Sequence, residues 1–157
     1  MMMERRWEDF APGLKVQSPG VTVTEAHLVN WTGLTGDWSS FHVDAEAAAG
    51  SVFGERVAHG PLTLALALGL VTQTGVFGDS IVAWIGLDEV RLPLPVRIGD
   101  TIRAQAEVIG VQETSNPARG RSVLAYLVSN QYGQVVMSFR SSFLLKRRSP
   151  AGDGALR

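Results

Sequence analysis

The sequence predicts an α+β fold in which a curved antiparallel sheet wraps around one long apolar helix. Helix-favouring patterns lie in the first half of the chain, strand-like patterns lie in the second half, and segment 59–75 is apolar almost all round. Segregated helices and strands are typical of α+β domains. A helix that is apolar on most sides needs to be buried, and a sheet that curls around it can cover it.

Two shorter helices are expected before the apolar one. Thr24 can cap a helix that runs to about Thr35 and stops at Gly36. Asp44 can cap a shorter helix over residues 45–49, which Gly50 should stop in the same way.

The long helix should begin at Pro61, because proline is favoured in the first turn. Gly60 stands immediately before it and has no side chain, so a ligand oxygen can approach its N–H closely. Free N–H groups at a helix start favour a negatively charged or polarised oxygen. The sequence therefore indicates an oxyanion-type donor at Gly60, with a plain helix-start turn as the alternative.

The second half contains the sheet. Four long strands are expected at 80–92, 101–113, 121–130 and 134–145, with a hairpin-like turn at 131–133 and a further short strand near 14–23. We therefore expect one domain over residues 1–145. Segment 146–157 is polar and contains glycine and proline, and we expect a disordered tail there, with its basic residues facing solvent.

Composition narrows the class of protein. The chain has 157 residues, 45% of them hydrophobic, which is enough for one domain with a real core. Its net charge of −1 argues against a nucleic-acid partner. The absence of cysteine excludes disulfides and zinc–thiolate sites. Neither a signal-peptide pattern nor an apolar run of membrane-spanning length is present, so we expect a cytoplasmic protein without a membrane partner.

The stretch GDWSSFH places Asp37 and His42 five residues apart. Five residues correspond to about 140° around a helix and to opposite faces of a strand, so the two side chains meet only if the intervening chain bends as a loop. A shared chemical site is one interpretation; a turn aspartate and a hydrogen-bonded structural histidine are the alternatives. As a base, Asp37 would need drier surroundings to raise its pKa, which Trp38 and Phe41 can supply.

Two blocks of sequence carry a family resemblance. TGDWSSFHVDAEAA followed by FGERVAHGPLTLALALGL resembles the signature of the MaoC-like dehydratases, the (R)-specific enoyl-CoA hydratase family, which has the hotdog fold. The resemblance implies that Asp37 and His42 bind a water between them and that the Gly60 N–H holds the thioester carbonyl of an enoyl-CoA. Asp37 would take a proton from the water as it attacks Cβ, and His59 would be structural. The resemblance implies no metal and no cofactor, and a coenzyme A thioester as the substrate.

The chain departs from the family pattern at two places. Ser39 and Ser40 replace the usual Asn-Pro, so the loop lacks the fixed φ of proline. A serine often found in the central helix corresponds to Ala65, which has no hydroxyl. Ser40 and Thr63 are therefore candidate supporting residues.

Two other functions stay open. A hotdog thioesterase needs a carboxylate on or near the central helix, but segment 61–71 contains no acidic residue. A non-catalytic acyl-CoA-binding protein is the other alternative. Since a small curved sheet leaves edge strands that invite pairing, we expect a homodimer or a dimer of dimers.

Overall fold

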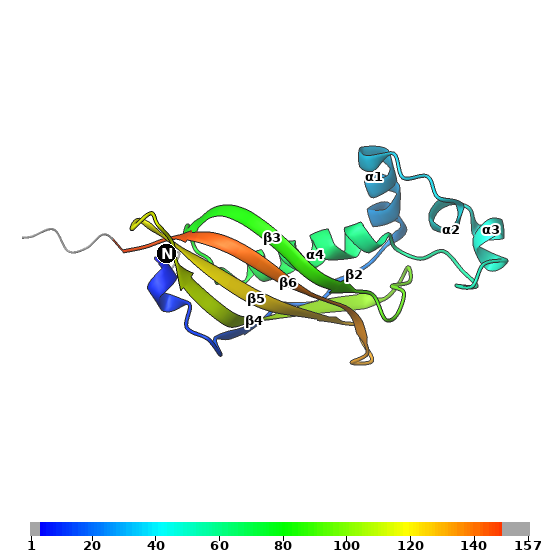
Figure 1. Ribbon diagram of the computed structural model, residues 1–157. Helices are drawn as coiled ribbons and strands as arrows, with labels where there is room; N and C mark the ends of the chain where they lie inside the picture. The colour runs from blue at the N-terminus through cyan, green and yellow to red at the C-terminus, as the bar shows by residue number, and fades with distance from the viewer. Residues whose placement is uncertain (1–3, 149–157) are drawn as a thin grey trace, which may run out of the picture.

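The computed structural model describes residues 4–148, and Figure 1 shows its architecture. The helices are η1 (Trp7–Asp9, a 3-10 turn), α1 (Glu25–Thr35), α2 (Ser40–Val43), α3 (Ala45–Ala49) and α4 (Gly60–Gln73). The strands are β1 (Lys15–Gln17), β2 (Val21–Thr22), β3 (Ile81–Arg91), β4 (Thr101–Glu113), β5 (Arg119–Ser129) and β6 (Val135–Lys146). The predicted α+β fold is confirmed.

The sheet is antiparallel, with strand order β1-β4-β5-β6-β3 and β2 paired separately to β4. The four long strands lie where they were predicted, to within two residues. The expected short strand near 14–23 is two strands, because the chain breaks at Ser18 and Pro19. Proline cannot donate to a ladder, and the Ser18 hydroxyl instead accepts from Ala104 N–H at 2.9 Å. The sheet therefore has six strands rather than five.

The sheet curves around α4, which gives the expected hotdog arrangement (Figure 1). One side of α4 packs into the core through Leu62, Ala67, Leu70 and Val71. Its opposite side, with Pro61, Ala65 and Gly69, is exposed. The expectation of a helix buried on most sides is therefore wrong for this stripe. Small residues line it, so hydropathy alone did not distinguish it from the buried side.

The helix ends follow the caps in the sequence, with two differences. Gly36 adopts the left-handed conformation after α1, as expected. The Asp44 carboxylate accepts from Glu46 N–H and Ala47 N–H at the start of α3. Gly50 ends α3 as predicted, but it is right-handed, at φ −83°, and so differs from Gly36. Helix α4 begins at Gly60, one residue earlier than predicted.

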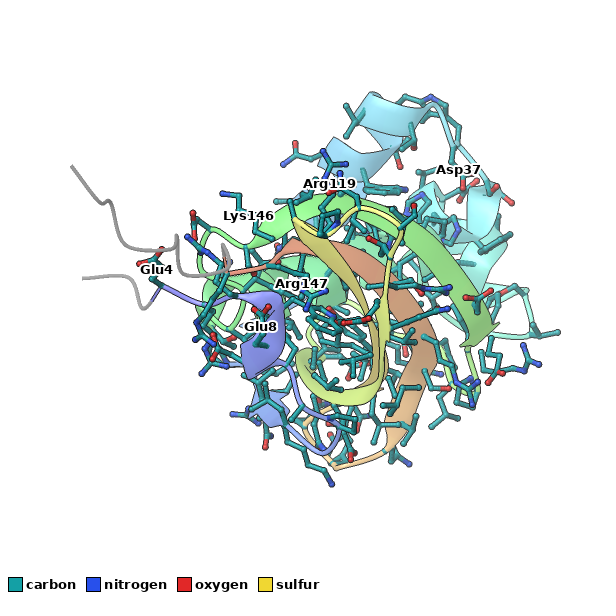
Figure 2. The ribbon with its side chains drawn as sticks, turned by 60° about the vertical axis from the view of Figure 1, so that its left-hand side comes forward. Glu4, Glu8, Asp37, Arg119, Lys146 and Arg147 are labelled. Carbon is teal, nitrogen blue, oxygen red and sulfur yellow. The ribbon has the colours of Figure 1, made fainter. Side chains whose placement is uncertain are left out.

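The described part of the expected tail belongs to the fold. Lys146 is the last residue of β6 and pairs with Arg119. The Arg147 guanidinium lies 3.2 Å from Glu8 and 4.6 Å from the centre of the Trp7 ring, so it does not simply face solvent (Figure 2). Residues 149–157 lie outside the described residues. No helix within residues 4–148 is long and apolar enough to cross a bilayer.

Candidate active site

The loop after α1 brings the predicted pair together. Asp37 directly follows the left-handed Gly36, and the one-turn helix α2, which was not predicted, carries His42 back toward it. His59, which is farther along the chain, joins the pair: a carboxylate oxygen of Asp37 and one ring nitrogen each of His42 and His59 all lie within 4.8 Å of one another. Asp37 lies by the α1–α3 segment, away from Glu8 and Arg147 (Figure 2).

The Asp37 carboxylate is held as an anion. Its Oδ1 accepts from the Ser39 hydroxyl at 2.7 Å and from Ser39 N–H at 3.2 Å. These two hydrogen bonds lower the pKa of Asp37 below its usual value. Trp38 is 68% exposed and does not enclose the carboxylate. The expectation that Trp38 and Phe41 raise this pKa is therefore wrong.

His42 is buried and its tautomer is fixed. Its Nδ1 lies 2.7 Å from the Val57 carbonyl oxygen, which can only accept, so Nδ1 carries the proton. In the neutral ring, Nε2 therefore has a free lone pair. Burial is the main cause that lowers the pKa of His42, and it keeps the ring neutral at pH 7.

His59 lies against both members of the pair. It is fully buried, and its ring stacks on His42 with centroids 3.7 Å apart. Its Nε2–H points to the Asp37 carbonyl oxygen at 3.2 Å and to the Thr32 hydroxyl at 3.3 Å. Stacked imidazoles present their faces to each other, which is unlike two histidines whose lone pairs converge on one metal ion.

A pocket of about 420 Å³ opens beside His42. Its lining is mainly apolar and comprises Phe41, His42, Phe53, Val57, Ala58, Gly60, Thr63, Leu92, Pro93, Leu94, Pro95, Val96 and Val136. Among the hydrogen bonds of residues 4–148, none uses the Gly60 N–H. The structure thus places a free helix-start donor and the His42 imidazole on one cavity.

The supporting residues differ from those predicted. Ser39 rather than Ser40 contacts Asp37, and Ser40 is exposed and absent from the pocket wall. An Asp followed two residues later by Ser is a common turn pattern, which was the available signal for Ser39. Thr63 lines the pocket, and its hydroxyl donates to the His59 carbonyl at 3.3 Å.

Ala65 does not line this pocket. It lines a separate hollow with Gly20 and Val21 of the β2 segment. The missing hydroxyl at position 65 therefore removes no group from the wall beside His42.

A helix held in a curved sheet is the arrangement of the hotdog fold, and here an Asp37–His42 pair lies at the edge of an apolar pocket that His42 and Gly60 line. Residues 9–127 match the family described as MaoC like domain, and the chain belongs to this family. The 3-hydroxyacyl-thioester dehydratase Z of Mycobacterium tuberculosis is 41% identical over 108 residues, which cover 68% of this chain and 72% of that protein. Protein MaoC of Klebsiella aerogenes is 40% identical over 99 residues, 63% of this chain but only 29% of that longer protein.

Solved structures agree with this family. The monoamine oxidase regulatory protein of Archaeoglobus superposes with a TM-score of 0.88 at 34% identity, covering 92% of this chain and 96% of that one. The MaoC-like dehydratase of Rhodospirillum rubrum gives a TM-score of 0.84 at 28% identity, covering 93% and 99%.

Proposed function

We propose that this chain is an (R)-specific enoyl-CoA hydratase, or in reverse a 3-hydroxyacyl-CoA dehydratase, which adds or removes water across a 2-enoyl thioester. The observation that carries the proposal is the closeness of Asp37 to His42, whose imidazole lines the same pocket as the free Gly60 N–H. Asp37 itself does not line this pocket and reaches it only through its neighbour His42. Membership of a family that includes dehydratases supports the same reaction class.

Asp37 and His42 can hold one water between them. The carboxylate is an acceptor, and so is Nε2 of His42, because Nδ1 donates to Val57. A water that donates a hydrogen to each keeps an oxygen lone pair free to attack Cβ of the enoyl group.

His42 is the better proton acceptor of the two. The Ser39 hydrogen bonds lower the pKa of Asp37, so its carboxylate is a weak base. We therefore assign proton transfer to His42 and orientation of the water to Asp37, which reverses the roles expected from the sequence. As the water oxygen bonds to Cβ, its proton passes to His42 Nε2 and the electron pair moves to the thioester oxygen.

Gly60 stabilises the charge that develops on that oxygen. A preorganised donor of this kind contributes about 2.7–4 kcal/mol in comparable sites. Proton return from His42 to Cα on the same face then restores the thioester carbonyl and the neutral imidazole. The result is a syn addition of water that needs no metal or redox step.

The proposed assembly is a homodimer or a dimer of dimers. Strand β3 is an edge of the sheet and pairs only with β6 among the described strands. It exposes Trp84 and Ile85, which are 51% and 48% accessible. A long apolar edge strand favours pairing with a second copy.

Crotonyl-CoA tests the proposed function. The purified protein is incubated with it while the enoyl-thioester absorbance and the free thiol are followed together. Loss of the enoyl signal without thiol is the expected result, and chiral analysis of the product tests the (R) configuration. Release of thiol would instead indicate a thioesterase. Binding without turnover, across short and longer 2-enoyl chains, would indicate an acyl-CoA-binding protein.

A further inference from the structure

His59 links Asp37, His42 and Gly60, which are otherwise held in position by separate contacts. Asp37 is held by Ser39 within its own loop, and His42 is held by Val57. His59 contacts both, through its Nε2–H to the Asp37 carbonyl and through its ring face to His42. It also precedes Gly60 in the chain and is the N-cap residue of α4.

The Nδ1 atom of His59 is buried without a hydrogen-bond partner among residues 4–148, which is unexpected for a residue that only fills space. Its Nε2 must carry the proton, because the Asp37 carbonyl can only accept. Its Nδ1 is then a lone pair, which is buried and has no partner among residues 4–148. Leaving a buried polar atom without a hydrogen bond destabilises a fold, whereas a phenylalanine ring would stack on His42 without this cost.

We propose that His59 is a positioning residue for the hydration reaction: by holding the Asp37 main chain and the plane of the His42 ring at the start of α4, it aligns Asp37, His42 and the Gly60 N–H on one water and one thioester. The inference rests on the proposed hydratase function. His59 itself does not line the pocket, so its proposed role is through Asp37, His42 and Gly60.

Two substitutions separate the two contacts. His59→Phe keeps a ring to stack on His42 but removes the donor to Asp37, and His59→Gln keeps a donor but removes the ring. Since misplacement of reacting groups acts on the rate, each variant should lose about tenfold to 100-fold in kcat, with KM for crotonyl-CoA changed less than about threefold. Equal kcat per folded molecule in both variants, with only a lower Tm, would show that His59 is merely structural.

A measurement without turnover tests the same alignment. The charged or titratable groups that face His42 are Asp37 from the loop and His59 from the start of α4. The Asp37 carboxylate raises the pKa of His42, so Asp37→Asn should lower that pKa in an NMR titration of the His42 imidazole. If His59 holds Asp37 and His42 together, the lowering of the His42 pKa by Asp37→Asn should be smaller when His59 is also replaced. We expect it to fall by about half or more in the His59→Phe or His59→Gln background.

The two readouts distinguish the two proposals. An unchanged response of the His42 pKa in both backgrounds would overturn the positioning role, whichever variant folds better. A wild-type protein that hydrates no enoyl-CoA would overturn the proposed function, while the NMR cycle would still report whether His59 aligns the pair.

Discussion

His42 donates its Nδ1–H to the Val57 carbonyl oxygen over 2.7 Å, and this one hydrogen bond ties α2 to the segment that leads into α4. It fixes which nitrogen of the imidazole carries the proton. It also leaves Nε2 as the atom that can accept a proton from water. The chemistry proposed for Asp37 and His42 depends on this relationship.

Loss of either member of the pair should reduce turnover strongly. His42→Ala removes the proposed proton acceptor, and Asp37→Asn removes the charge that orients the water. General acid–base groups contribute about 10²–10⁴-fold, so His42→Ala should lose at least two decades in kcat. A misplaced water costs about 10²-fold, so Asp37→Asn should lose about that much, while KM changes much less in both variants. Steady-state hydration of crotonyl-CoA measures both, with thermal melting as the control for folding.

The double variant tests whether the two groups share one water. Residues that act as a unit are strongly non-additive, so Asp37→Asn with His42→Ala should be little slower than the slower single variant. Fully additive losses would show that Asp37 and His42 act separately. A near wild-type rate for His42→Ala would contradict its role as the proton acceptor.

The pH dependence should follow His42. The base must be unprotonated, and burial lowers its pKa below the usual value of about 6.5, so kcat/KM should be flat at neutral pH and fall only below about pH 6.5. Because the Asp37 carboxylate raises the pKa of His42, Asp37→Asn should move this acid limb to still lower pH. Rate profiles between about pH 3 and pH 8 decide the point. A decline confined to the range near pH 4 would identify a carboxylate as the base instead.

Much of this architecture follows from local signals in the sequence. The alternation of Ile102, Ala104, Ala106 and Val108 predicted β4 with its observed bounds, because each of these side chains faces the core. The Asp44 cap and the Gly36 stop predicted helix ends, since both act through their own neighbouring backbone. Patterns that depend only on nearby residues can be interpreted directly.

The parts that were missed depend on backbone groups, on the exposure of small residues and on loop geometry, none of which a side-chain pattern shows. Val57 acts through its backbone carbonyl, which no side-chain pattern reveals. The exposed stripe of α4 is formed of small residues such as Ala65, so exposure there did not require polar side chains. Ser39 lies in the family block, but only the observed turn shows that its hydroxyl reaches Asp37 and lowers the pKa.

An added methyl group at Gly60 should weaken thioester binding and turnover. A Cβ there would lie 2.9 Å from Leu92 Cδ2, on the wall of the pocket. Gly60→Ala should therefore reduce kcat/KM by about 10²-fold, because the oxygen can no longer approach the N–H donor. The control is Gly60→Ala with Leu92→Ala, which relieves the contact with Leu92. Full recovery in that pair would mean that crowding by Leu92, rather than access to the N–H, caused the loss.

Charge on the β3 edge should separate the proposed subunits. Ile85→Arg places a cation on the exposed apolar edge strand, and the protein should become monomeric in light scattering at about micromolar concentration. Leu127→Arg is the matched control, since Leu127 is 43% exposed but lies on β5 and is paired on both sides, with Gln105 of β4 and Ser138 of β6. A wild-type protein that is monomeric, or an Ile85→Arg protein that keeps its oligomeric state, would contradict pairing through β3.

Trp7 should make Gly120 intolerant of any side chain. A Cβ added at Gly120 would overlap the Trp7 indole ring, which is fixed by its Nε1–H bond to the Arg121 carbonyl at 3.0 Å and covered by Arg147. Gly120→Ala should therefore destabilise the fold by about 1–3 kcal/mol, and each kcal/mol lowers Tm by about 2–4 °C in a protein of this size. Gly110→Ala on β4 is the matched control, because its added Cβ meets no described atom within 4 Å. Gly120→Ala should therefore melt at a lower temperature than Gly110→Ala. Equal Tm values for the two variants would show that η1 moves aside without cost in stability.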